Sequence, residues 1–270
     1  MARRWVGTVL LLAGCATVAQ ATRAPVVAVG RLLLSEDEEK RLGDELAAEV
    51  RQRERMVDDA AVQEWIAKVQ DRIAAAVPEE DRKFPFQTQV VDDPETVNAF
   101  ALPGGHLFVY SGLILQAENE AEVAAVLAHE VAHVALDHPA QQLAARIGVD
   151  TLRAIALGER PGAIAQLASG IAAQGYVAAH SREQEEEADR YGLFYLAGAG
   201  YDPNAMVSFF RKLDRLQGSE PDLVSRFFAS HPSTPERIQL LEGTIREQRL
   251  RGKATAQVGG FEQIQARLRR

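Results

Sequence analysis

The spacing of apolar and polar positions predicts a mainly helical chain with a small sheet. Apolar residues recur three and four apart in several segments, and alternate with polar ones in a few short ones. The helical spacing predicts helices at 35–55, 59–77, 121–136, 140–157, from 181 onward, 204–216 and 235–246. The alternating segments predict strands at 84–91, 98–102 and 106–110. The expected fold class is therefore mainly α with a small β-sheet (α+β).

Two further segments have no clear pattern of this kind. Residues 162–179 carry no charge and are rich in Ala, Gly, Gln and Ser. We expect a helix there that is half-buried or lies on a membrane surface, with a membrane span as the alternative. Residues 248–270 are basic and loosely patterned, and we expect them to form a C-terminal tail outside the folded domain.

The run His129-Glu130-Val131-Ala132-His133 lies inside one of the predicted helices. Two histidines four residues apart stand about 40° from each other on a helix of 3.6 residues per turn, so both imidazoles can reach one metal ion. Glu130 lies beside that face and can act as a general base. The helix is apolar nearly all round, which indicates burial. Because buried histidines and a buried glutamate need partners, the segment predicts a metal site, with Zn²⁺ as the ion.

A catalytic zinc site commonly has three protein ligands, so a third must come from elsewhere. The extended motif with a third histidine six residues on is absent, because Pro139 stands there. The candidates are His138, His180, His231 and the acidic cluster near Glu185. On a continued helix His138 would point away from the metal, so we interpret it as a helix-end residue stabilised by the helix dipole. Glu185 and Asp189 share one helix face, which predicts Glu185 as ligand and Asp189 as the acceptor for a ligand histidine's second N–H.

The first residues have the layout of a secretory signal. Arg3 and Arg4 precede a short apolar stretch, and Leu12-Ala13-Gly14-Cys15 resembles a bacterial lipobox, in which the cysteine is lipidated. This predicts a signal peptide at 1–14, a linker at 15–34 and an anchor at Cys15. The residue after Cys15 is not aspartate, which by resemblance to Gram-negative lipoproteins implies the outer membrane, facing the periplasm. The alternative is a cleaved signal that leaves a soluble periplasmic protein. A net charge of −8 disfavours nucleic acid as a partner.

Four motifs together resemble those of the M48 zinc peptidases, in particular their periplasmic lipoprotein branch. They are N-A-F-A-L-P-G-G at 98–105, H-E-V-A-H at 129–133, S-R-E-Q-E-E-E-A-D at 181–189 and H-P-S-T-P-E-R at 231–237. The resemblance implies a zincin-like metallopeptidase domain, here placed at 35–247. It also implies one zinc ion per chain held by His129, His133 and Glu185, with Glu130 as base.

Further roles follow from position. Arg237 falls in the first turn of a helix that starts at Pro235, where a cation opposes the helix dipole, so we predict an oxyanion donor. His231 precedes that helix and is expected either to be a second donor or to be a removable fourth ligand. We expect substrate to pair with the strand 106–110, which assigns substrate binding to Asn98, Gly104, Gly105, His106 and Phe108.

The function predicted from these features is that of a zinc endopeptidase acting on unfolded or misassembled proteins of the bacterial envelope. One alternative is a chaperone or assembly factor with a structural zinc site. The intact Glu130 argues against it, because a structural site needs no base. The other alternative is an integral membrane protease that uses residues 162–179 as its span.

Overall fold

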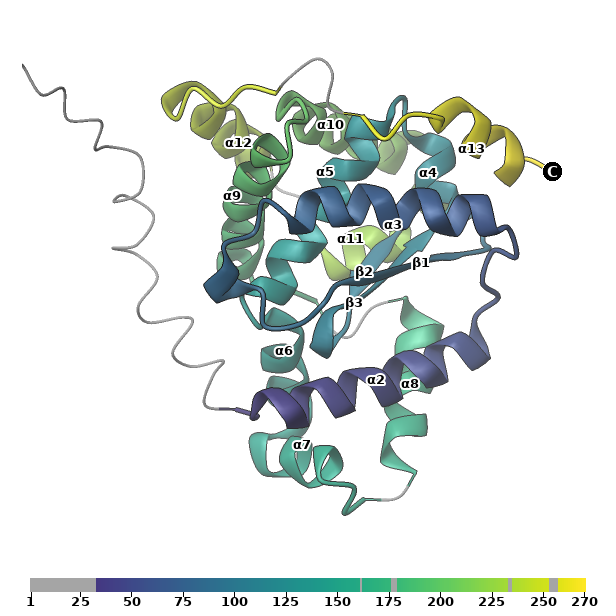
Figure 1. Cartoon of the computed structure of the whole chain (residues 1–270), viewed down its shortest axis with the longest axis vertical. Coiled ribbons are helices and arrows are strands. Elements are labelled where there is room, and N and C mark those ends of the chain that lie inside the picture. Colours follow the sequence, from purple (N-terminus) through teal and green to yellow (C-terminus); the bar gives the residue numbers. More distant parts are fainter. Residues whose placement is uncertain (1–32, 161, 176–178, 233–234, 253–256) are drawn as a thin grey trace, which may run out of the picture.

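The computed structural model describes residues 33–160, 162–175, 179–232, 235–252 and 257–270. The signal peptide, Cys15 and most of the linker lie outside these residues. The described elements (Figure 1) are α2 (Glu36–Arg53), α3 (Ala60–Ala74), η1 (Glu79–Asp81), β1 (Gln87–Val91), β2 (Ala99–Ala101), η2 (Pro103–Gly105), β3 (His106–Tyr110), α4 (Ser111–Gln116), α5 (Glu120–Ala135), α6 (His138–Ile147), α7 (Val149–Ala156), α8 (Ala163–Gln174), α9 (Arg182–Gly198), α10 (Asn204–Ser219), α11 (Pro221–Ser230), α12 (Pro235–Glu247) and α13 (Phe261–Leu268). The predicted fold class, mainly helical with a small sheet, is confirmed.

Three helices begin at residues whose side chains cap them. Ser35 and Glu38 form a capping box at α2, in which the Ser35 hydroxyl accepts from the Glu38 N–H and the Glu38 carboxylate accepts from the Ser35 N–H. Asp59 caps α3, and Ser181 with Gln184 caps α9 in the same way as α2. These local hydrogen bonds satisfy backbone donors that have no partner inside the helix.

One helix prediction was wrong, and some helices were not predicted. The single helix expected at 140–157 is two helices, because Gly148 between them has a φ of 82° that breaks the helical backbone. Helix α11 was not predicted. It begins at Pro221 and buries Val224 and Phe227, a spacing that is helical but short.

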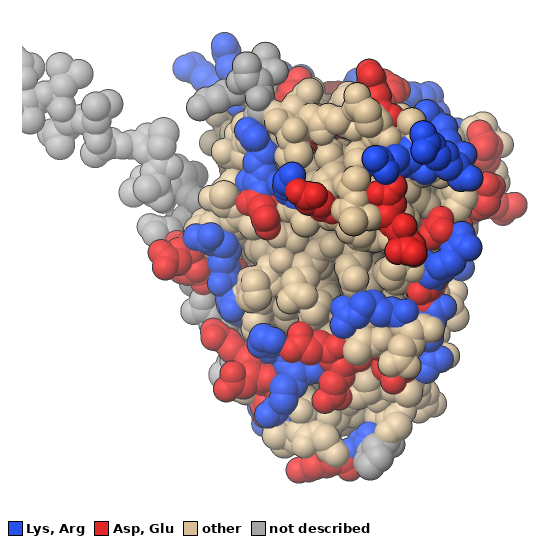
Figure 2. Space-filling model, turned by 45° about the vertical axis from the view of Figure 1, so that its right-hand side comes forward, with Lys and Arg blue, Asp and Glu red and all other residues tan. Residues whose placement is uncertain are grey.

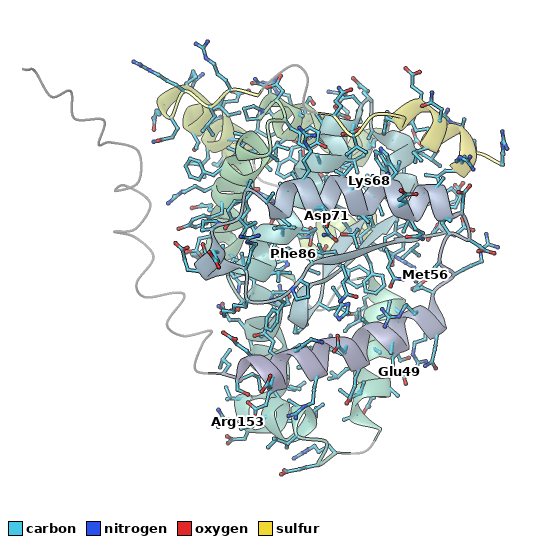
Figure 3. The ribbon with its side chains drawn as sticks, viewed as in Figure 1. Glu49, Met56, Lys68, Asp71, Phe86 and Arg153 are labelled. Atoms are coloured by element: carbon cyan, nitrogen blue, oxygen red, sulfur yellow. The ribbon has the colours of Figure 1, made fainter. Side chains whose placement is uncertain are left out.

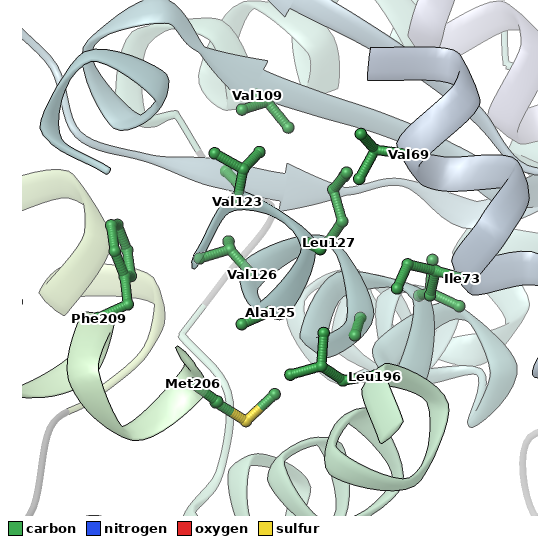
Figure 4. Close-up of a cluster of buried hydrophobic side chains, with 14 of the residues drawn as sticks. Val69, Ile73, Val109, Val123, Ala125, Val126, Leu127, Leu196, Met206 and Phe209 are labelled. Carbon is green, nitrogen blue, oxygen red and sulfur yellow. The ribbon is translucent and has the colours of Figure 1, made fainter. Parts of the chain in front are cut away.

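The sheet has the order β1-β3-β2, with β1 parallel and β2 antiparallel to β3. Residues alternate between its two faces. Val90, Leu107 and Val109 face a core shared with α3, α5, α9 and α10 (Figure 4). Val91, Phe108 and Tyr110 face a second core shared with α2, α6, α7 and α8. Both faces of β3 are therefore buried, which explains why its five residues are all inaccessible to solvent.

The C-terminal residues pack on the body rather than forming a separate tail. The rings of Phe261 of α13 and Trp65 of α3 lie 5.9 Å apart between centroids, and Ile264 is buried in the main core. The Gln265 side chain donates to the Ile114 and Ala117 carbonyls at the end of α4, 2.9 Å each. The prediction of a loosely patterned tail missed this helix because eight residues give a weak periodic signal.

Helix α8 occupies most of the uncharged segment, whose residues 176–178 lie outside the described ones. It buries Ala168 and Ile171 in the core shared with α2 and leaves its other side half-exposed. Within the described ranges no helix has the length and apolar character needed to cross a membrane. Arg153 of α7 (Figure 3) donates to the Leu33 carbonyl just before α2. Charged side chains of both signs are interspersed on the face shown in Figure 2.

Candidate metal centre

Helix α5 carries both histidines of the motif into the protein interior. All its residues except Ala121 are buried, because the helix packs between the sheet, α3, α9 and α10. The Nε2 atoms of His129 and His133 lie 3.0 Å apart, so the two rings converge on one point. Burial lowers the pKa of His133 well below 6.5, which keeps that imidazole neutral as a metal ligand requires.

Helix α9 crosses α5 closely at this point and carries Glu185, the predicted third ligand. A Cβ at Gly192 would lie 3.1 Å from the His129 backbone, so glycine allows the two helices to approach. The Glu185 carboxylate lies 3.4 Å from His133 Nε2 and 3.6 Å from His129 Nε2. Burial opposes ionisation of Glu185, but His231 and Arg237 outweigh it and hold its pKa well below 4.5. The carboxylate is therefore available as a charged ligand.

Asp189 and Arg237 form a buried ion pair behind the histidines. Asp189 Oδ1 lies 3.1 Å from His129 Nδ1, the position predicted for a residue that orients this ligand. Arg237 donates through Nε and Nη2 to the two Asp189 oxygens, 2.8 Å each, and its Nη1 lies 2.7 Å from Glu185 Oε2. These donors are engaged by carboxylates, which favours a role of Arg237 in holding Glu185 and Asp189. The role of oxyanion donor stays a prediction.

His231 reaches the site from the end of α11. Its N–H backbone group bonds the Phe227 carbonyl at 2.7 Å, which fixes the residue at the helix end. Its Nδ1 lies 3.0 Å from Glu185 Oε1, and its Nε2 lies 3.4 Å from Glu130 Oε1. Burial lowers the pKa of His231, but the attraction of Glu185 and Glu130 outweighs it and raises this pKa above 6.5. Both expected roles of His231, donor and fourth ligand, require this location.

Glu130 is a buried carboxylate that faces the same point. Its side chain is 1% exposed, and neither oxygen has a hydrogen-bond partner within the described part of the chain. Burial raises its pKa above 4.5, in spite of the attraction of His231 and His129. An uncompensated buried carboxylate is costly, so this one indicates a group that is still to be bound.

The residues present fit a divalent metal ion. One atom each from His129, His133, Glu185 and His231 lies within 4.8 Å of the others, and all four residues are buried. Two imidazoles with one carboxylate is a ligand set of catalytic metal sites in hydrolases. The ion would sit among these atoms, with Glu130 beside it.

His138 does not behave as predicted. It was interpreted as the last residue of the motif helix, but α5 ends at Ala135 and His138 is the first residue of α6. The intervening Asp137 has a φ of 61°, which turns the chain back on itself. His138 Nδ1 consequently lies 2.8 Å from His133 Nδ1. Nothing in the linear spacing indicated this turn.

The substrate-binding prediction was also wrong in its structural basis. Strand β3 is the central strand and is paired on both sides, so it offers no free edge. Gly104 and Gly105 have positive φ and pack against the backbone of α2 and Pro85. The side chains of the other three predicted residues are engaged within the protein. Asn98 donates to the Gly175 carbonyl at 2.7 Å, His106 Nε2 lies 2.8 Å from Asp44, and Phe108 stacks on Phe100.

A helix carrying H-E-x-x-H, a glutamate from a second helix close to both histidines, and the buried Glu130 beside them form the arrangement typical of metalloprotease sites. Residues 60–245 match the sequence pattern of peptidase family M48. The chain therefore belongs to peptidase family M48.

Several relatives share this region. A candidate beta-barrel assembly-enhancing protease of Vibrio cholerae serotype O1 is 36% identical over 219 residues, which are 76% of this chain and 43% of that protein. The mitochondrial metalloendopeptidase OMA1 of Schizosaccharomyces pombe is 33% identical over 183 residues, 68% of this chain and 53% of that protein. Metalloprotease LoiP of Escherichia coli is 35% identical over 147 residues, 53% of this chain and 56% of that protein. The chain thus spans about half the length of these relatives.

Proposed function

We propose that this chain is a zinc endopeptidase that cleaves unfolded or misassembled proteins of the bacterial envelope. The observation that carries the proposal is the convergence of His129, His133 and Glu185 next to Glu130, a buried carboxylate with no hydrogen-bond partner within the described residues. Three ligands would hold the ion, and the base would stand ready beside it. A zinc site that served only stability would not need Glu130.

The chemistry divides between the ion and the chain. When bound, zinc supplies Lewis acidity that polarises the scissile carbonyl and makes water more acidic. Glu130 takes the proton from the attacking water and passes it to the leaving amine. His231 stands opposite Glu130 and would either donate to the developing oxyanion or cover the open ligand position.

Strand β2 replaces β3 as the proposed place for an extended substrate. It borders the sheet, and no described strand pairs with its outer side. The N–H of Leu102 and the carbonyl of Asn98 bond to β3. By the alternation of an antiparallel ladder, the backbone groups of Ala99 and Ala101 then face outward. A substrate strand that reached these groups, which are buried in the structure, would lie across α5, which packs against β2.

The location and substrate class come from two other lines of support. The lipobox-like Leu12-Ala13-Gly14-Cys15 supports a lipid anchor in the outer membrane with the domain in the periplasm, the alternative being a soluble periplasmic protein. The relatives named for beta-barrel assembly support envelope proteins as substrates. Replacement of Cys15 by serine should release the full chain from the membrane fraction. Unchanged fractionation would refute the anchor.

Zinc content and cleavage of unfolded casein, measured on the same purified full chain, test the function. We expect one zinc per chain, loss of cleavage with a chelator and recovery on adding zinc. Glu130→Gln should keep the zinc and lower kcat by about a hundred- to ten-thousandfold. Wild-type protein that holds zinc but does not cleave casein would favour the chaperone alternative. Cleavage by Glu130→Gln at the wild-type rate would refute the mechanism.

A further inference from the structure

A second histidine lies directly behind the ligand His133. His138 is fully buried at the start of α6, and its Nδ1 lies 2.8 Å from His133 Nδ1. The other nitrogen of His138, Nε2, lies 3.4 Å from Glu187 Oε2 on α9. Glu187 stands between the ligand Glu185 and Asp189 in sequence and has a side chain that is 27% exposed. A line of contacts therefore runs from His133 through His138 to the Glu187 carboxylate near the surface.

Metal binding would fix the positions of the ring protons of His133 and His138. His133 points its Nε2 toward His129 Nε2 and Glu185, so the proton of the neutral ring must be on Nδ1. Two ring nitrogens at 2.8 Å share one proton, so His138 Nδ1 must be the acceptor. The proton of a neutral His138 is then on Nε2, the atom that faces Glu187. Each tautomer follows from the one before it.

The two ligand histidines are thus supported differently by the same helix. Asp189 of α9 lies directly against His129 Nδ1, at 3.1 Å. Glu187 of α9 is too far to touch His133, and His138 stands between them. A ligand histidine that donates its second N–H to a partner is held in orientation and binds the metal more strongly.

The turn at Asp137 keeps His138 in this place. Its left-handed backbone is uncommon for a residue other than glycine, and Lys83 pairs with its buried carboxylate. The surrounding structure therefore holds an unfavourable conformation, whose effect is to bring His138 back beside His133.

We propose that His138 and Glu187 are positioning residues that orient His133 toward the metal. The inference rests on the proposed zinc site, and the wild-type zinc affinity tests that site separately. The competing arrangement is a second metal ion held by His133, His138 and His180, whose ligand atoms also lie within 4.8 Å of one another. That arrangement would require His133 to give both nitrogens to metals.

Zinc affinity of the full chain, measured by competition with a coloured chelator, tests the proposal. His138→Leu removes the acceptor and should weaken zinc binding by about ten- to a hundredfold. His138→Asn places an amide oxygen near the former Nδ1 but loses the link to Glu187, so a smaller loss is expected. Glu187→Ala should match that smaller loss. His138→Asn and Glu187→Ala combined should be no worse than either alone, because both interrupt the same line of contacts from His133 to Glu187. Glu186→Ala, at an exposed neighbour on α9, should bind as wild type.

Cobalt in place of zinc gives a second readout that a purely structural role would not move. The visible absorption of the Co²⁺ protein should shift in His138→Leu and stay near wild type in His138→Asn. Equal losses for Leu and Asn, or Glu187→Ala behaving as Glu186→Ala, would overturn the proposal. Two zinc ions in wild type and one in His138→Leu would establish the second metal instead. If His138→Leu does not fold, the Asn and Glu187 variants decide. A wild-type chain that binds no zinc would refute the proposed function itself.

Discussion

Arg237 donates two hydrogen bonds of 2.8 Å to Asp189, and both side chains are buried. Asp189 in turn lies 3.1 Å from Nδ1 of His129, a predicted ligand. The pair joins α12 to α9, and α9 to the motif helix α5. Burial opposes charge on Asp189, but Arg237 outweighs it and lowers the pKa of the carboxyl below 3.8. The site is therefore charged and ordered before a metal arrives, which lowers the cost of binding it.

Arg237→Met should destabilise the metal-free protein by about 3–5 kcal/mol, because it leaves buried carboxylates without their cation. Zinc affinity should fall as well, since Glu185 and Asp189 lose their common partner. Chemical denaturation with and without zinc measures both effects. Arg246→Met, at an exposed position of the same helix, is the control and should change neither quantity. A stable Arg237→Met with wild-type zinc affinity would contradict the positioning role.

Glu185→Ala should lower zinc occupancy far more than Glu183→Ala or Glu186→Ala. Only Glu185 places a buried carboxylate within 4 Å of both ligand histidines, whereas its two neighbours are exposed. Zinc per chain after dialysis, measured by atomic emission, gives the answer. Loss of metal in Glu186→Ala, with Glu185→Ala still loaded, would show that the wrong face of α9 had been assigned to the metal.

His231→Ala should change the rate of casein cleavage while zinc stays bound. A slower rate, by about a hundredfold or more, identifies a donor to the oxyanion, and a faster rate identifies a fourth ligand that keeps the site idle. Turnover and zinc content are measured on one preparation. Ser225→Ala, exposed on α11, is the control. Loss of zinc would make His231 part of the metal site proper and contradict this assignment.

Glu39 should make the stability depend on pH. Burial, together with Asp137, raises the pKa of Glu39 to about 7 in the folded chain, from 4.5 when exposed. Between these values the folded state keeps a proton that the unfolded state releases, so stability falls as pH rises. The loss is complete above about pH 7 and amounts to about 3 kcal/mol.

Glu39→Gln removes this titration. The variant should gain stability over wild type progressively from about pH 5 to pH 8, by up to about 3 kcal/mol. Denaturation of both proteins across this range measures the difference, in which titrating groups that do not interact with Glu39 cancel. A difference that does not vary with pH would show that Glu39 is ionised in the folded protein at neutral pH.

Local features of the sequence determined much of the fold. Ser35, Asp59 and Ser181 start their helices because their side chains bond backbone donors two or three residues away. The spacing of His129 and His133 places both rings on one side of α5 for the same reason, since helix geometry is set within a few residues. The spacing alone therefore predicted the convergence of the two rings, and the apolar residues around them predicted their burial.

Tertiary packing decided the rest, because it brings together residues that are distant in sequence. The partners of the Arg237 side chain depended on Asp189 and Glu185 of α9, about fifty residues earlier in the sequence. The place of β3 in the centre of the sheet depended on its pairing with β1, which no local pattern contains. His138 meets His133 only through the left-handed turn at Asp137, which Lys83 stabilises from another part of the chain. Short-range geometry therefore fixed the ligand helix, while long-range contacts fixed how its ligands are held.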